Sequence, residues 1–227
     1  MQSRVAHGQK GITLVELLIS MSIFLVILLG IYLIFDVHHA IFASGESMAD
    51  VQFNARYTMA QMARQIRMTG YYPENFDANS ANNLANPVAI QVATNDALAV
   101  FGDADGSGVS NVWLFCLDAT SSLIRVRAPV GTAAAYTCAQ GRILGRNITS
   151  LAFAYFGDNN TPIPNPPPLV AYQLDGEGLG APPPFASTTQ RGAVRRVVIT
   201  LTARETVPGQ QPQTYTLTSD LRLRNLN

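Results

Sequence analysis

Residues 12–35 read ITLVELLISMSIFLVILLGIYLIF, a run of apolar residues in which Glu16 carries the only charge. A helix of this length rises ~36 Å at 1.5 Å per residue. That is enough to cross the ~30 Å hydrocarbon core of a bilayer with some tilt. We therefore expect a membrane-spanning helix near the start of the chain.

Charges on the two sides of this run predict its orientation. Arg4 and Lys10 precede it, whereas the residues with charged side chains that first follow it are acidic: Asp36, Glu46 and Asp50. The positive-inside rule then puts residues 1–11 in the cytoplasm and the rest of the chain outside. An ordinary signal anchor or a cleaved secretory signal are the alternatives, but a secretory signal has a shorter apolar run that ends in a small-residue cleavage site. Here the candidate small residue, Gly11, precedes the run.

Glu16 is costly inside an apolar segment, by roughly 2.5–3.5 kcal/mol on insertion scales. Such a carboxylate normally has a partner. If the chain is cut after Gly11, the new α-amino group lies on Ile12, four residues before Glu16 and on the same helical face. The alternative is a glutamate near the membrane interface that is neutralised by protonation.

The stretch KGITLVELLIS (10–20) resembles the processing signal of type IV prepilins: a short basic leader that ends in glycine, then an apolar residue, a glutamate and a long apolar helix. The resemblance implies that a membrane-embedded prepilin peptidase cleaves between Gly11 and Ile12 and methylates the new N-terminus. It also implies that Glu16 pairs with the amine of a neighbouring subunit during assembly. Ile12 departs from the usual phenylalanine, and the helix lacks the proline found in many major pilins.

The helix is expected to continue beyond the apolar run as an amphipathic half over residues 36–70. Its apolar residues recur at three- and four-residue steps, and Gly70 followed by Tyr71, Tyr72 and Pro73 predicts its end. The stripe comprises Met48, Val51, Ala55, Met59, Met62 and Ile66. We expect it to pack under a sheet rather than to bind a metal or a partner.

Residues 71–227 are predicted to form a β-rich head, because apolar and polar residues alternate along several segments. The predicted fold is therefore α+β and pilin-like: one long N-terminal helix packed on an antiparallel sheet. Prolines between residues 157 and 192 argue against a central strand there and predict a surface loop between two strands of one sheet. The strand candidates are 88–93, 97–101, 112–117, 122–128, 151–155, 194–204 and 214–224.

The head also resembles PilW-type minor pilins in NARYTMAQMARQIRMTGYYP (54–73), VRRVVITLTAR (194–204) and LRLRN (221–225). It is similar, more loosely, to the J-type pseudopilins of type II secretion. The resemblance implies an inner-membrane protein with a periplasmic head that later joins a pilus at the cell surface. Its implied partners are the prepilin peptidase, the pilus assembly platform, the major pilin and other minor pilins, with which it primes and caps a type IV pilus for motility, adhesion or DNA uptake.

Composition argues against an enzyme. Residues 71–227 contain no histidine, which removes Ser-His-Asp and Cys-His arrangements from the head. The two cysteines rule out a four-cysteine zinc site. Formal net charge is zero, so nucleic acid is not an expected partner, although a DNA-contacting face made by the arginines, such as Arg195, Arg196, Arg222 and Arg224, stays open. A ligand-binding pilus-tip adhesin or DNA receptor is a further alternative, and a membrane-tethered hydrolase a remote one.

Two smaller sites can be proposed in the head. Outside the inner membrane the compartment is oxidising, so we expect a disulfide between Cys116 and Cys138; two free buried thiols are the alternative. Asp103, Asp105 and Ser107 have the spacing of the first ligands in a calcium loop. Leu114 stands where that loop needs its glutamate, and Asp-Gly and Ser-Gly are also ordinary turn dipeptides. The turn is the favoured interpretation, calcium the alternative, and no other cofactor is expected.

Overall fold

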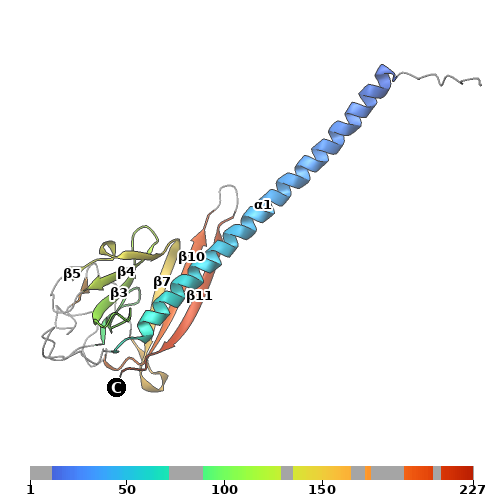
Figure 1. Cartoon of the computed structure of the whole chain (residues 1–227). Coiled ribbons are helices and arrows are strands. Elements are labelled where there is room, and N and C mark those ends of the chain that lie inside the picture. Colours follow the sequence, from blue (N-terminus) through green and yellow to red (C-terminus); the bar gives the residue numbers. More distant parts are fainter. Residues whose placement is uncertain are drawn as a thin grey trace, which may run out of the picture. The chain divides into compact units, whose positions relative to one another are not determined.

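The chain is described by a computed structural model that covers residues 12–71, 89–128, 135–164, 172–174, 192–206 and 211–226. Within these residues it has one α-helix and an otherwise β-rich fold whose strands pair antiparallel (Figure 1). The predicted α+β class is therefore confirmed. The chain forms two compact units, residues 1–46 and 47–227. The division between them falls within the helix, and the predicted segments 12–35, 36–70 and 71–227 stay predictions.

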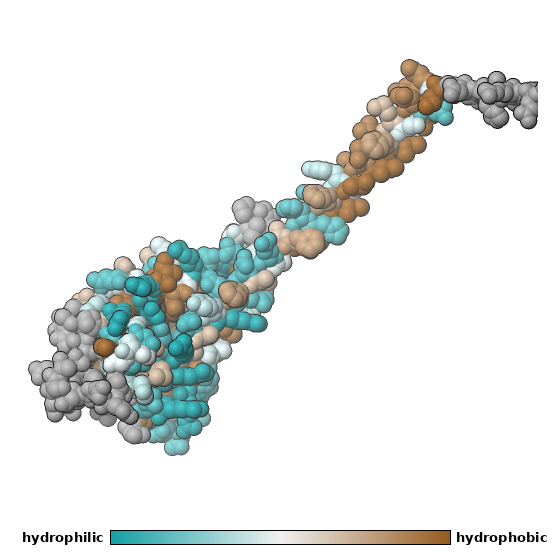
Figure 2. All heavy atoms as spheres, in the orientation of Figure 1, coloured by the Kyte–Doolittle hydropathy of each residue, from teal (hydrophilic) through white to brown (hydrophobic). Residues whose placement is uncertain are grey.

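Helix α1 comprises 54 residues, Leu14–Arg67. In the first unit, every large apolar side chain from Ile12 to Phe42 is exposed, and this part of the helix is mostly brown in the space-filling view (Figure 2). This segment is apolar nearly all the way round, which is typical of a helix that lies in lipid or among other helices rather than in water.

The later part of α1 is amphipathic and belongs to the second unit. The predicted stripe is confirmed, since five of its six members are buried and Met48 is half-buried. The buried members are Val51, Ala55, Met59, Met62 and Ile66. Side chains at three- and four-residue steps share one helical face, so this face supplies one wall of the core.

Gly70 ends the helical region, as predicted. Its φ is +75°, a left-handed conformation that glycine adopts without steric cost. Its amide donates to the Phe101 carbonyl at 2.9 Å, and a β-carbon here would lie 2.8 Å from the carbonyl oxygen of Asn225. A residue with a side chain is therefore disfavoured both by conformation and by space.

A four-stranded sheet in the order β11-β10-β7-β8 packs on the buried stripe of α1. It comprises β7 (Ile148–Phe156), β8 (Pro162–Ile163), β10 (Arg196–Glu205) and β11 (Gln213–Arg222). Val197, Ile199 and Leu201 alternate with more exposed residues along β10 and are fully buried. The period-two pattern therefore predicted both the strand and its inner face.

A five-stranded sheet in the order β1-β2-β3-β4-β6 makes up most of the rest of the head. Its strands are β1 (Ile90–Ala93), β2 (Leu98–Gly102), β3 (Asn111–Leu117), β4 (Leu123–Ala128) and β6 (Arg142–Gly145). The strand candidates 88–93, 97–101 and 112–117 correspond to β1, β2 and β3, and β1, β2 and nearly all of β3 are buried on both faces. Trp113 and Phe115 face the core with α1, whereas Leu114 and Cys116 belong to a second apolar cluster.

The second cluster also includes residues outside the large sheets. Leu174 belongs to it, and Tyr136 and Cys138 pack against it. Tyr136 lies in β5 (Ala135–Tyr136), which pairs with β9 (Tyr172–Gln173), and Cys138 begins the short 3-10 helix η1 (Cys138–Gln140).

The proline-bearing segment 157–192 has only short elements among its described residues. These are η2 (Asp158–Asn160), the edge strand β8 and strand β9. Pro162 lies in β8, at the edge position that proline tolerates. The strands that flank the segment, β7 and β10, are direct neighbours in one sheet, as predicted. Residues 165–171 and 175–191 lie outside the described part.

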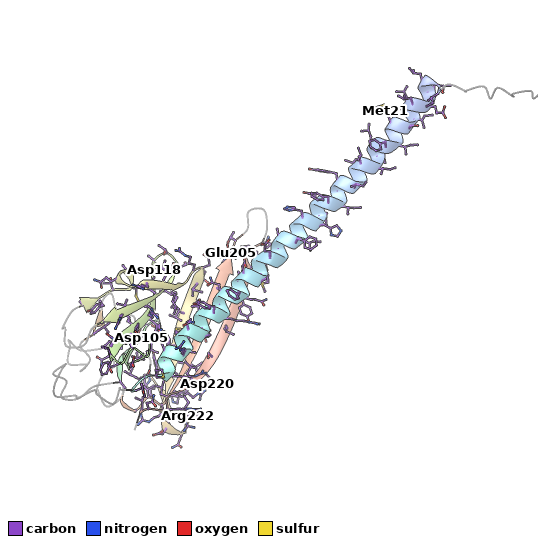
Figure 3. All side chains as sticks on the ribbon, in the orientation of Figure 1. Met21, Asp105, Asp118, Glu205, Asp220 and Arg222 are labelled. Carbon is purple, nitrogen blue, oxygen red and sulfur yellow. A yellow bond between two sulfur atoms is a disulfide. The ribbon has the colours of Figure 1, made fainter. Side chains whose placement is uncertain are left out.

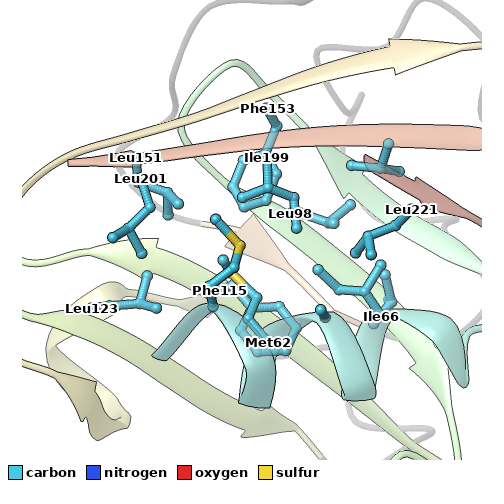
Figure 4. Packing of buried hydrophobic residues seen from close by; sticks show 14 of the residues in the cluster. Met62, Ile66, Leu98, Phe115, Leu123, Leu151, Phe153, Ile199, Leu201 and Leu221 are labelled. Atoms are coloured by element: carbon cyan, nitrogen blue, oxygen red, sulfur yellow. The ribbon is translucent and has the colours of Figure 1, made fainter. Parts of the chain in front are cut away.

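The main core lies where α1 meets both large sheets, as Figure 4 shows. Met62 and Ile66 come from α1, Leu98 and Phe115 from the five-stranded sheet, and Ile199 from the four-stranded sheet. All five side chains are fully buried. Truncating such a residue to alanine typically costs about 2–5 kcal/mol, so the amphipathic part of α1 is integral to the head.

Candidate functional site: the start of the helix

The first turn of α1 is capped by the side chain that precedes it. The Glu16 amide donates to Thr13 Oγ1 at 3.3 Å, which satisfies one of the backbone donors that every helix start leaves unpaired. Thr13 and Glu16 have the spacing of a capping box, in which a glutamate three residues after the cap reaches back to the cap's amide. The sequence TLVE (13–16) carried this signal, and our sequence reasoning missed it.

Glu16 lies in the first turn, where its negative charge is favourable to the helix dipole. Within the described residues its carboxylate makes no ion pair. Gly11 lies outside the described residues, and Ile12, the first described residue, is exposed. The cleavage, the methylation and the pairing of Glu16 with an amine therefore stay predictions.

The serine hydroxyls of the apolar segment are bonded to the helix backbone. Ser20 Oγ donates to the Glu16 carbonyl and Ser22 Oγ to the Ile19 carbonyl, both at 2.8 Å. A hydroxyl in hydrocarbon needs such a partner, since no water is present to replace it. These bonds lower the cost of burying the segment in an apolar environment. By length and composition, α1 is able to cross a membrane.

The two cysteines form a disulfide in the structure. Cys116 in β3 and Cys138 in η1 have Cα atoms 5.9 Å apart and are 22 positions apart in sequence. The bond ties the buried strand β3 to the segment that covers the second apolar cluster. The pairing proposed from the sequence is present, and free buried thiols are not.

Asp103 organises a turn within the predicted calcium loop. Its carboxylate accepts the Ser107 and Gly108 amides, each at 2.9 Å, and Asp105 accepts the Ser107 amide at 3.2 Å. Burial acts to raise the pKa of Asp105, but hydrogen bonds from Ser107 and Asp103 and the charge of Arg127 outweigh it and lower the pKa. Backbone amides thus bond both oxygens of the Asp103 carboxylate and one oxygen of Asp105.

In the part of the chain that the structure describes, no group of three or more His, Cys, Asp or Glu side chains is arranged to hold a metal ion. The residues present therefore fit a hydrogen-bonded turn better than a calcium loop. Calcium binding by Asp103, Asp105 and Ser107 stays a prediction.

The arginines at one end of the four-stranded sheet lie near acidic residues. Arg196 Nε donates to the Asp220 carboxylate at 2.8 Å, and Arg195 Nε lies 4.0 Å from an oxygen of Asp158. Figure 3 labels Asp220 beside Arg222. Arg195 and Arg196 thus have acidic neighbours within the chain; whether this face contacts DNA remains a prediction.

Comparison with known proteins gives one finding for this region. The family model of the prokaryotic N-terminal methylation motif matches residues 6–32. This match covers the predicted cleavage position, Glu16 and most of the apolar run. Comparison with curated proteins finds no match.

The motif and the fold together indicate the class of protein to which the chain is similar. A methylation motif at the head of a long apolar helix, followed by antiparallel sheets, supports a pilin or pseudopilin of a pilus or secretion system. The motif implies processing by a prepilin peptidase and assembly with other pilins, and it suggests a structural rather than an enzymatic protein.

Proposed function

We propose that this chain is a PilW-type minor pilin that assembles with other minor pilins to prime and cap a type IV pilus. The observation that carries the proposal is the acid at position 16, inside a matched methylation motif and at the start of a helical segment whose large apolar side chains are all exposed as far as Phe42. A carboxylate in that setting calls for a cationic partner. The methylated amine of a neighbouring subunit would supply it.

The proposed location is the inner membrane, with the head in the periplasm before assembly. Two observations support this orientation. Basic residues precede the apolar run and acidic residues follow it, and the head carries a disulfide, which persists in an oxidising compartment. In this arrangement the peptidase and the assembly platform act on the first unit, and the other minor pilins and the major pilin contact the assembled helix.

Glu16→Leu separates assembly from simple anchoring. Removing the acid makes insertion into lipid easier, so membrane levels should equal those of wild type, and intact mass should still show loss of residues 1–11 and gain of one methyl group. Assembly should fail or weaken, because the amine of the neighbouring subunit would stay uncompensated in an apolar environment. The measurements are surface pili and co-purification of the other minor pilins.

Ser20→Leu is the matched control, because it makes the same helix more apolar and leaves the acid in place. It should assemble as wild type does. Normal piliation and co-purification with Glu16→Leu would contradict the proposed assembly contact and favour a solitary anchored head. If Glu16→Leu abolishes protein secretion but leaves pili normal, the chain would instead be a J-type pseudopilin.

A further inference from the structure

A pocket of about 390 Å³ lies on the five-stranded sheet, next to the chain's single tryptophan. Its charged wall residues are Asp105, Arg125, Arg127 and Arg142, and Gln140 and Gly141 complete the wall beside Trp113. All of these residues belong to the second unit. Asp105 is labelled in Figure 3.

The strand register brings the three arginines together. Arg125 and Arg127 are two residues apart in β4, so their side chains share one face. Arg127 lies opposite Trp113 of β3, and Arg125 lies opposite Arg142 of β6. Like charges directly opposite each other destabilise a sheet. The Arg125–Arg142 pair is therefore a local cost that packing alone does not explain.

The tryptophan holds two of the guanidinium groups in place. Arg125 Cζ is 5.0 Å and Arg127 Cζ 5.6 Å from the centroid of the Trp113 ring. The ring is 2% exposed, so its face is covered and not offered for stacking on a sugar or a base. Cation–π contact therefore restricts the orientation of these two guanidinium groups.

The charge of the pocket is not balanced by the described residues. Among the described residues, salt bridges within 4.0 Å are formed by Arg195 and Arg196, which lie outside the pocket. None involves Arg125, Arg127 or Arg142. Burial lowers the pKa of Arg125, the positive charges of Arg142 and Arg127 lower it further, and Asp105 opposes them. Three arginines and one aspartate leave a formal charge of +2.

We propose that this pocket binds a phosphate group in its dianionic form. Guanidinium groups match phosphate oxygens with paired N–H donors, and a dianion neutralises the formal charge of +2 that the four charged residues carry. A bound dianion would also relieve the repulsion between Arg125 and Arg142. The inference holds for a pilin and for a pseudopilin alike, since it rests on the head alone.

Trp113 reports on binding directly, because it is the only tryptophan of the chain and touches two of the arginines. The full-length chain in detergent is titrated with inorganic phosphate at a pH where the dianion predominates, with ionic strength held constant by sodium chloride. We expect a saturable change of Trp113 emission at millimolar phosphate. No saturable change, or an equal change with chloride alone, would overturn the proposal.

Two further ligands separate the possible sources of the phosphate. Glycerol phosphate, a monoester dianion, should compete with inorganic phosphate if the site accepts phosphate on a larger molecule. If only inorganic phosphate binds, the site takes the free ion, and the proposal still stands. Acetate binding as tightly as phosphate would overturn the assignment to a dianion.

Three variants complete the test. Arg142→Gln should weaken phosphate binding about tenfold, a loss of about 1.4 kcal/mol, because it removes a charge-assisted hydrogen-bond donor to the anion. Asp105→Asn should tighten binding, because it removes the one negative charge of the pocket and keeps an oxygen for the Ser107 amide. Arg204→Gln is the matched control: it removes the same charge from an exposed position on β10. Equal weakening by Arg204→Gln, or no tightening by Asp105→Asn, would contradict the pocket assignment.

Discussion

Gly145 of β6 lies directly against Thr58 of α1, so closely that a β-carbon at position 145 would overlap the threonine side chain. Thr58 is completely buried. Helix and sheet therefore meet at a point where one partner needs to be glycine.

Gly145→Ala should destabilise the head by about 1–3 kcal/mol, the usual cost of overpacking a well-filled core. The measurement is the midpoint of denaturant unfolding followed by Trp113 fluorescence. Gly192→Ala is the matched control, because a β-carbon there meets no atom within 4 Å, and it should leave the midpoint unchanged. Equal effects of the two substitutions would show that the close approach of Gly145 and Thr58 does not limit packing.

The disulfide should contribute about 3 kcal/mol to the stability of the head, since it closes a loop between positions 22 apart in sequence. Replacing both cysteines by alanine should lower the melting temperature of the detergent-solubilised chain, and a reductant should lower that of wild type to a similar degree. The reductant should leave the double variant unchanged. Thiol titration of the unfolded, unreduced protein should find no free thiol; finding two would refute the bond.

Because of Asp118, the free energy of unfolding of the head should depend on pH in the acidic range. Burial acts to raise the pKa of its carboxyl, but hydrogen bonds from Ser122 and Thr120 and the charge of Arg146 outweigh it and lower the pKa. The Thr120 and Ser122 amides lie 2.9 and 2.8 Å from Oδ1. A lowered folded-state pKa stabilises the fold above the ordinary aspartate value of about 3.9. That contribution is lost as the pH falls through the lower folded-state value.

Asp118→Ala removes the acceptor and should therefore lower the free energy of unfolding at neutral pH. The difference from wild type should shrink as the pH falls below about 4. Urea titrations at a series of pH values measure it. A difference that stays constant down to strongly acid pH would show that the carboxylate is not held in its charged form by these bonds.

Calcium should leave the melting temperature of wild type unchanged relative to a chelator, because the Ser107 and Gly108 amides already bond the Asp103 carboxylate. Asp103→Ala should lower the melting temperature in both conditions, since it opens the turn. A ligand that binds only the folded state raises stability by mass action. An increase with calcium in wild type that is absent from Asp103→Ala would therefore establish a calcium site.

Sequence reasoning predicted the parts of the fold that are buried on one face. Along β10, Val197, Ile199 and Leu201 alternate with less buried residues because the sheet meets the core on one side only. The apolar stripe on α1 could likewise be predicted, because only one face of the helix meets the core and its residues recur at helical spacing. Cys116 and Cys138 could be paired because the chain has no other cysteine.

Features that depend on pairing between segments distant in sequence could not be predicted from the sequence. The run VWLFC (112–116) is buried on both faces of β3, and such a run does not indicate what covers it. The strand at 122–128, which carries Arg125 and Arg127, was predicted, but the approach of Arg142 depends on the register between β4 and β6. The contact of Gly145 with Thr58 likewise depends on how sheet and helix pack.

The exposed apolar part of α1 affects how the stability of this protein is defined. No side chain of the described chain buries the large apolar residues between Ile12 and Phe42, so their free energy depends on the medium around them. The unit from Ser47 onward contains both apolar clusters. A melting curve recorded in detergent therefore combines the unfolding of that unit with a transfer equilibrium of the helix. The stability of the whole chain is therefore defined by two constants: the equilibrium constant for folding of the unit from Ser47 onward, and the partition coefficient of the apolar helix between water and an apolar medium.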